Sequence, residues 1–154
     1  MPEMPEMTEM TKITETTTGP IIVHSLADAE AAVAVAAELG VPVTLRSAPG
    51  AARYLGATVF RDMVAEARAR HADAAVTAVF DCGDDPGVAL GAVRHGLKVI
   101  RLDASAETRD RVADIAAQAG ARLEDEGRDP GPALDLLEAQ DPEAAVRAWL
   151  GGGD

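Results

Sequence analysis

The segment from Val76 to Gly87 reads VTAVFDCGDDPG and joins an apolar run to the start of a helix through an acidic turn. The run from Val76 to Phe80 predicts a strand that stops at Asp81. Asp85 is a typical helix N-cap, and proline suits the first helical position that follows it. Turns of this kind lie at the carboxyl ends of parallel strands, where ligands bind in α/β proteins. The segment therefore predicts a parallel sheet and a candidate site together.

The same alternation of strand and helix continues on both sides of this segment. Units of this spacing predict an α/β fold, with about five βα units that form a mainly parallel sheet. A helix between the second and third strands carries Val59, Phe60, Met63, Val64 and Ala67 on one face. The other expected strands span 21–23, 41–45, 97–102 and 121–123, and the other expected helices span 27–39, 86–95, 106–119 after Ser105 as cap, 133–139 and 142–150.

The pattern of the second and fourth strands bears on the shape of the sheet. Strands that helices cover on both faces are apolar throughout. These two strands instead alternate, with Thr44 and Arg46 on one face and with Arg101 and Asp103 on one face. The alternation indicates either a sheet face without a helical layer, as inside a barrel, or strands at an edge. An open three-layer sheet and a half-barrel-like sheet both fit this pattern, and the open sheet is slightly favoured.

Composition limits the classes of partner and location. A chain of 154 residues with 47% hydrophobic and 3% aromatic residues can bury one core of small aliphatic side chains. The net charge of −12 argues against nucleic acid and against an anionic membrane surface as partners. A single cysteine and a glutamate-rich start without a signal-peptide pattern favour a cytoplasmic protein. We expect residues 1–20 to form a disordered tail, residues 21–150 a single α/β domain, and residues 151–154 a second tail.

The strand ends supply candidate catalytic residues. If all strands are parallel, His24, Asp81 and Asp103 meet at one edge of the sheet. Two neighbouring carboxylates, Asp81 and Asp103, could hold a divalent metal such as Mg²⁺ or divide acid and base roles. His24 could act as a general base, because imidazole titrates close to neutral pH. The alternative is structural: the aspartates cap turns and helices, and His24 is a hydrogen-bonded turn residue.

The turn Ser47-Ala-Pro-Gly50, with flanking arginines, is the best candidate for binding an anion. Glycine allows close approach of the backbone, and the following helix offers free amide groups to phosphate or carboxylate. The turn matches neither the P-loop nor the dinucleotide-binding pattern, so a nucleotide cofactor is not implied. The expected ligand-binding residues are Arg46, Ser47, Gly50, Arg53 and Asp84.

Cys82 lies near the start of a helix, which favours the thiolate form. Its acidic neighbours act in the opposite direction and raise the thiol pKa. A catalytic thiol is therefore not expected.

The stretch from Asp81 to Ser105, DCGDDPGVALGAVRHGLKVIRLDAS, resembles one and a half βα units of the TIM-barrel aldolases. In that pattern a helix ending in A-x-x-x-G precedes an apolar strand. The stretch from His24 to Gly56 is similar to small uncharacterised bacterial α/β proteins that carry the same SAPG and DCGD turns. Together the resemblances cover roughly residues 20–122. The chain departs from the aldolase patterns, since it has neither a lysine placed for a Schiff base nor the histidine pattern of a zinc aldolase.

Two functions of different kinds follow. In the first, arginines hold a small anionic molecule, and Asp81, Asp103 and His24 transfer protons or hold a metal. In the second, the sheet stays open because about five βα units cannot close an eight-stranded barrel. Its exposed apolar face then drives homo-oligomer formation or protein binding. The first predicts that Arg46, Asp81 and Asp103 converge without neutralising one another. The second predicts that these residues form internal ion pairs.

Overall fold

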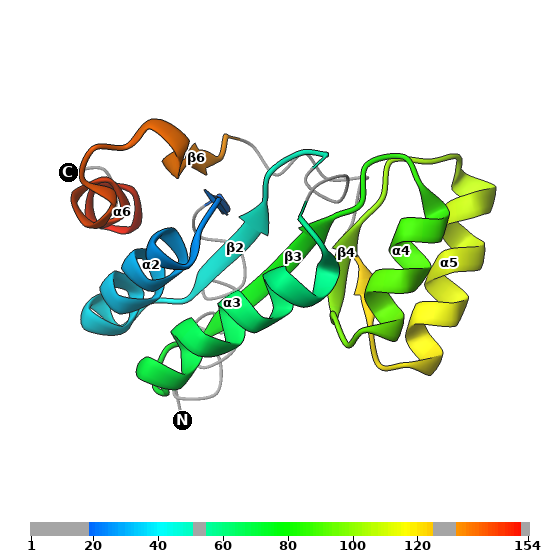
Figure 1. Cartoon of the computed structure of the whole chain (residues 1–154), viewed down its shortest axis with the longest axis horizontal. Coiled ribbons are helices and arrows are strands. Elements are labelled where there is room, and N and C mark those ends of the chain that lie inside the picture. Colours follow the sequence, from blue (N-terminus) through cyan, green and yellow to red (C-terminus); the bar gives the residue numbers. More distant parts are fainter. Residues whose placement is uncertain (1–18, 51–54, 125–131, 152–154) are drawn as a thin grey trace, which may run out of the picture.

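The computed structural model describes residues 19–50, 55–124 and 132–151 (Figure 1). Most of both expected tails, Arg53 and residues 125–131 lie outside these residues. The strands are β1 (Ile21–Val23), β2 (Val43–Ser47), β3 (Val76–Asp81), β4 (Val99–Arg101), β5 (Arg122–Leu123) and β6 (Leu134–Asp135). The helices are α2 (Leu26–Leu39), α3 (Ala57–Arg70), α4 (Pro86–Arg94), α5 (Ala106–Gln118), α6 (Pro142–Leu150) and the 3₁₀ turn η2 (Leu136–Glu138).

The strands form one parallel sheet in the order β5-β4-β3-β2-β1-β6. The first five follow their order in the chain, and the last strand returns to pair with the first. A closed barrel has this same cyclic order, because its last strand must pair with its first. The sheet therefore has the strand order of a barrel that is open between β5 and β6.

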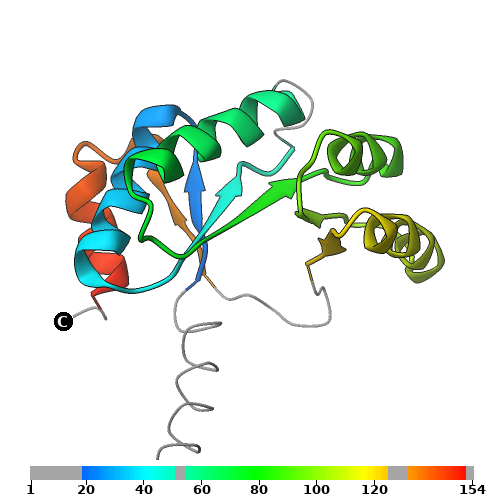
Figure 2. The same cartoon turned by 90° about the horizontal axis from the view of Figure 1, so that it is seen from below.

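The α-helices pack on one side of this sheet. Figure 2 shows them following one another around the sheet in the same order as the strands. One core cluster joins α2, α3, α4, α5 and α6 to a single sheet face that carries Ile21, Leu45, Phe80 and Ile100. The other face has no helix in the described part of the chain. The half-barrel-like arrangement is thus the one that forms, and the three-layer sheet is not.

The uncovered face carries the charged side chains of β2 and β4, as their alternation predicted, together with apolar residues of β1, β3 and β4. Arg46 lies in register with Ile22 and Val79, and Arg101 lies in register with Asp81. Both β2 and β4 have neighbours on each side, so the edge-strand explanation of their pattern is wrong. The pattern reflects a sheet face that helices do not cover.

The helix starts form where capping residues were expected. Ser25 Oγ accepts a hydrogen bond from the Asp28 N–H, and Asp28 Oδ2 accepts one from the His24 N–H. This is a reciprocal arrangement of the capping-box type. Asp85 caps α4 ahead of Pro86, and Asp141 likewise caps α6. These short-range contacts explain why the helix starts are readable from sequence.

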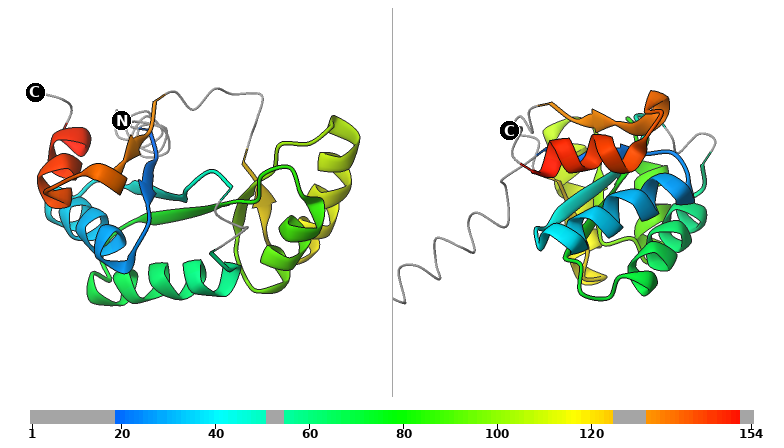
Figure 3. Two further views of the ribbon diagram at one scale, coloured as in Figure 1. Left: turned by 45° about the horizontal axis from the view of Figure 1, so that its top comes forward. Right: turned by 90° about the vertical axis from the view of Figure 1, so that its left-hand side faces the viewer.

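The C-terminal part differs from the sequence prediction. Residues 133–139 form β6 and the turn η2 instead of a helix. The Leu134 N–H donates to the Pro20 carbonyl, and Asp135 pairs with Ile22 of β1. Pairing with a distant strand has overridden the local pattern. The last helix, α6, does form, and it packs against α2 (Figure 3).

One strand boundary and one position expected to be buried also differ from the prediction. β2 runs from Val43 to Ser47 rather than over 41–45, so Arg46 and Ser47 belong to the strand. Val59 is 53% exposed, although the expected apolar face of α3 included it; Phe60, Val64 and Ala67 on that face are buried. In the described residues no helix has the length and apolar character needed to cross a membrane.

Candidate functional site

A pocket of about 970 Å³ opens at the carboxyl ends of β3 and β4. Three connections form it: the loop after β2, the turn between β3 and α4, and the segment that follows β4. This is the edge of a parallel sheet at which ligands bind. The described lining residues are Pro49, Gly50, Asp81, Cys82, Gly83, Asp84, Asp85, Val88, Arg101 and Asp103.

Asp81 is the buried carboxylate among the described lining residues. Asp81 is 8% exposed, and its backbone N–H donates to Ser47 Oγ at 2.8 Å. Its Oδ1 accepts the Gly83 N–H at 2.8 Å. Its Oδ2 lies 3.9 Å from Arg101 Nε, which is beyond hydrogen-bond distance. One oxygen is therefore anchored, and the other lies beside a guanidinium in a ligand-sized space.

The turn after Asp81 is attached to the neighbouring strand. The Cys82 N–H donates to the Arg101 carbonyl at 2.9 Å, and the Asp103 N–H donates to the Gly83 carbonyl at 2.8 Å. Gly83 has a φ of 61°, a conformation that glycine adopts at little cost. These bonds fix the ends of β3 and β4 together, so Asp81 and Asp103 line one pocket as the sequence predicted.

Glu124 connects two arginines across the uncovered face. Arg46 Nη2 donates to its two carboxylate oxygens at 3.1 and 3.3 Å, and Arg101 Nη1 donates to Oε1 at 3.0 Å. The Arg46 side chain is 9% exposed, and its Nε has no hydrogen-bond partner among the described residues. Arg46 is thus neutralised by Glu124, as the second hypothesis predicted. Asp81 and Asp103 line one pocket, but Asp81 Oδ2 lies 3.9 Å from Arg101 Nε, so the convergence without neutralisation that the first hypothesis predicted is met only in part.

Arg101 is the site residue that sequence reasoning did not identify. It is the one cationic side chain among the described lining residues. The alternation of β4 had placed it on the uncovered face, and its register with Asp81 follows from β3 and β4 being neighbours. The sequence thus indicated that Arg101 lies on this face, but the anion-binding role was assigned to Arg46 and Arg53, which flank the SAPG turn.

The charge balance of the pocket is acidic. Asp81, Asp84, Asp85 and Asp103 line it together with the single guanidinium of Arg101. Such a lining accepts hydrogen bonds from hydroxyl groups, and it repels a ligand more strongly as the number of its anionic groups increases. It favours an oxygen-rich ligand with at most one acidic group.

The remaining expected residues occupy different positions. Gly50 and Asp84 line the pocket. Ser47 is fully buried and supports Asp81 through the hydrogen bond given above. His24 lies outside the described lining, and its Nε2 is 2.7 Å from Asp135 Oδ1, in a contact that links the end of β1 to β6. The pKa of Asp135 is lowered: partial burial opposes the charged form, but the Leu137 N–H and His24 favour it more strongly.

Cys82 is 3% exposed, and burial raises the pKa of its thiol to about 12, with further contributions from the carboxylates of Asp81 and Asp85. Because the thiolate is the reactive form, only about one molecule in ten thousand is reactive at pH 8. We expect the folded protein to react very slowly with a disulfide reagent at pH 8 and rapidly in denaturant. The rate in the folded state should rise tenfold with each pH unit until unfolding begins.

Absorbance of the released thiolate measures both rates, and no second cysteine contributes to the signal. Rapid reaction of the folded protein below pH 9 would contradict the assigned burial of this thiol.

Two comparisons place the chain among known proteins. The family model described as fructose-bisphosphate aldolase class-II matches residues 3–127, which include β1 to β5 and the described pocket lining. A plasmid-encoded fructose-bisphosphate aldolase of Cupriavidus necator is 31% identical over 83 residues, corresponding to 54% of this chain and 24% of the relative. The chain thus spans about a quarter of the length of that curated relative.

Proposed function

This chain belongs to the class-II fructose-bisphosphate aldolase family, and from that premise we propose that its pocket binds a sugar-like small molecule carrying one phosphate or carboxylate group. The observation that carries the proposal is the pairing of the anchored carboxylate of Asp81 with the guanidinium of Arg101 inside one pocket. A guanidinium can bind phosphate or carboxylate through two parallel hydrogen bonds. The surrounding aspartates can accept hydrogen bonds from hydroxyl groups.

Asp81 is the residue best placed to exchange a proton with a bound hydroxyl group. Its Oδ1 is held by the Gly83 amide, which leaves Oδ2 to face the ligand. Asp103 lines the same pocket and is the candidate second carboxylate. The catalytic role predicted for His24 receives no support from this geometry, because His24 contacts Asp135 near β6.

The alternative function, a self-associating module, required an exposed apolar sheet face. The uncovered face instead presents Thr44, Arg46, Thr77 and Arg101. The apolar residues of this face, Ile22, Val79 and Val99, are buried and offer little exposed apolar surface for association. This gives the small-molecule site the better support, and a homo-oligomer stays a prediction.

The binding test compares fructose 6-phosphate with fructose, fructose 1,6-bisphosphate and inorganic phosphate by thermal shift and calorimetry. We expect the monophosphate to bind most tightly, because it offers several hydroxyl groups and one anionic group. A ligand at a hundred times its dissociation constant stabilises the folded state by about 2.7 kcal/mol, which is a visible shift in Tm. Asp81→Asn should weaken binding about tenfold or more, the effect of losing about 1.4 kcal/mol of charged hydrogen bonding.

The matched control is Asp110→Asn, which makes the same chemical change at an exposed position on α5. It should bind the monophosphate like the unmodified chain. Absence of binding by all four compounds, or equal binding by the Asp81 and Asp110 variants, would overturn the proposal.

A further inference from the structure

The aldolases of this family use a divalent metal, typically zinc, and the described residues can be tested against that requirement. Protein zinc sites contain three or four converging histidine, cysteine or carboxylate ligands. In the described part of the chain, no three His, Cys, Asp or Glu side chains come together in such a group. The chain contains histidine, cysteine and carboxylate side chains, so a metal site depends on whether these side chains lie close together.

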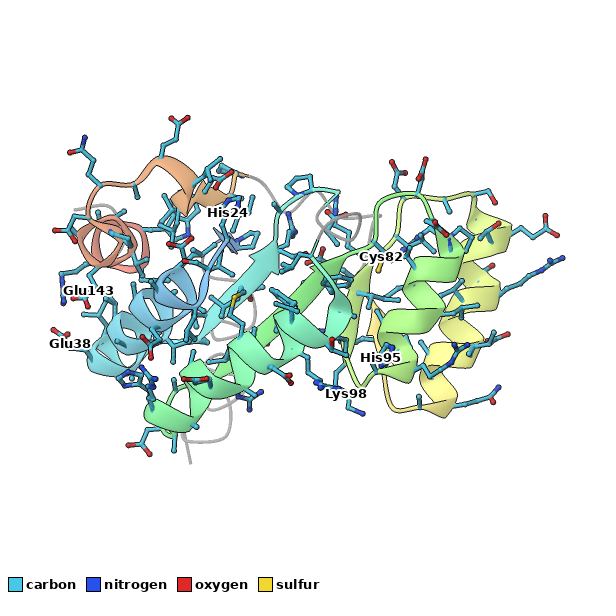
Figure 4. All side chains as sticks on the ribbon, in the orientation of Figure 1. His24, Glu38, Cys82, His95, Lys98 and Glu143 are labelled. Carbon is cyan, nitrogen blue, oxygen red and sulfur yellow. The ribbon has the colours of Figure 1, made fainter. Side chains whose placement is uncertain are left out.

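The histidines are far apart. His24 lies at the end of β1, while His71 and His95 are the C-terminal caps of α3 and α4. Helices that connect parallel strands run back along the sheet, so their C-termini lie at the edge opposite the strand ends. Figure 4 shows His95 at the other end of α4 from Cys82. Two of the three histidines therefore lie at the edge of the sheet opposite the pocket.

Two of the donors inside the pocket are engaged in other contacts. Asp85 Oδ1 accepts the N–H groups of Gly87 and Val88 and caps α4. Cys82 is buried, and its Sγ faces the Phe80 carbonyl at 3.7 Å. These residues do not fit the metal centre of the family.

We infer that the pocket works without a bound divalent metal and that the guanidinium of Arg101 supplies its positive charge. Arg101 Nη1 is fixed by Glu124 at 3.0 Å, and its Nε lies 3.9 Å from Asp81 Oδ2. Its side chain is 30% exposed, which leaves hydrogen-bonding edges open to the pocket. Glu124 is in turn held by the buried Arg46. The cation beside Asp81 is thus a side chain held by strands β2, β4 and the end of β5.

A guanidinium in this position suits a particular ligand chemistry. Its planar fork binds the oxygens of one phosphate or carboxylate group. It cannot provide the several open coordination positions with which a metal polarises a carbonyl oxygen. The inference about ligand binding rests on the proposed function, whereas the inference about the metal does not.

The first test measures metal directly on the full, untagged chain. The protein is dialysed against EDTA, incubated with Zn²⁺ or Mg²⁺, passed through a desalting column and analysed by native mass spectrometry and elemental analysis. We expect no stoichiometric metal and the same Tm with EDTA, Zn²⁺ or Mg²⁺. One metal per chain that is lost in Asp81→Asn or Asp103→Asn would overturn the inference.

The second test asks whether the guanidinium replaces the metal in binding. Fructose 6-phosphate should bind with the same Kd in EDTA and in Zn²⁺. Arg101→Met should weaken its binding at least tenfold, and the affinity of Arg101→Lys should lie between those of the unmodified chain and Arg101→Met. Arg111→Met, at an arginine whose side chain is 77% exposed on α5, is the matched control and should bind normally. Binding that requires Zn²⁺ would overturn the inference. If no sugar binds, the proposed function fails, while the metal analysis still decides whether the chain holds a metal.

Discussion

Replacing Glu124 by alanine is expected to lower the free energy of unfolding by about 3 kcal/mol, because it leaves a buried cation without its counterion. The Arg46 side chain is only 9% exposed, and its Nη2 donates to both carboxylate oxygens of Glu124. Its Nε already has no hydrogen-bond partner among the described residues. A guanidinium in this setting cannot lose its proton, so the protein must distort or admit water. Urea denaturation at pH 7 measures the loss.

The matched variant is Arg46→Met, which removes the buried charge and keeps most of the side-chain volume. Glu124 keeps its hydrogen bond to Arg101, so we expect a loss of less than about 1 kcal/mol, since apolar replacements of buried ions are often nearly neutral. The double variant should be more stable than Glu124→Ala alone. Equal losses in the two single variants, or strictly additive losses in the double variant, would show that the two residues do not act as a pair.

The Glu124 variant also connects stability with the site. Glu124 Oε1 holds Arg101 Nη1, and Arg101 is the pocket cation. Loss of the carboxylate frees Arg101 to approach Asp81 more closely than its present 3.9 Å. A tighter pair of this kind would neutralise both groups for a ligand. Arg46→Met leaves this part of the arrangement intact, so the two variants separate the support of the fold from the support of the pocket.

Local signals explain the parts of the fold that the sequence predicted well. Asp85 and Pro86 start a helix through contacts within a few residues, and the apolar run before Asp81 stops at a polar turn. The alternation of Thr44 and Arg46 depends only on the pleat of one strand and on a face without helices. Such features need no knowledge of distant partners. They gave the α/β class and the edge of the sheet at which Asp81 and Asp103 meet.

The parts that failed depend on contacts between distant segments. Leu134 and Asp135 form a strand because β1 offers an unpaired edge, and nothing within residues 133–139 signals that edge. Arg46 and Glu124 are separated by two intervening strands in the sheet order, so their contact needs the topology and the curvature of the sheet. The counterion of Arg46 comes from the end of β5, on the far side of β3 and β4. The anion-binding role expected for Arg46 stays a prediction, and its ion pair with Glu124 does not support it.

Replacing Phe80 by alanine is expected to cost about 4 kcal/mol, which is typical of deleting a fully buried aromatic side chain. Phe80 is 1% exposed on β3, and its ring centroid lies 5.5 Å from that of Phe60 on α3. The sequence has only two phenylalanines, and the core around them consists mostly of alanine, valine and leucine. Short side chains of this kind cannot swing into the cavity, so little of the lost packing is recovered. Chemical denaturation followed by circular dichroism measures the change.

The control is Phe80→Leu, because leucine fills part of the same volume. It should lower the free energy of unfolding by about 1–2 kcal/mol, which lies between the loss for a conservative core exchange and the loss for a cavity. Phe80 directly precedes Asp81, and its side chain lies on the helix-covered face, whereas Asp81 faces the pocket. Phe80→Leu should therefore lower Tm while the folded protein keeps its affinity for fructose 6-phosphate. Equal stability of the leucine and alanine variants would contradict a rigid core at this point. A large loss of affinity in the leucine variant would show that the pocket depends on the packing beneath it and not only on Ser47, Gly83 and Arg101.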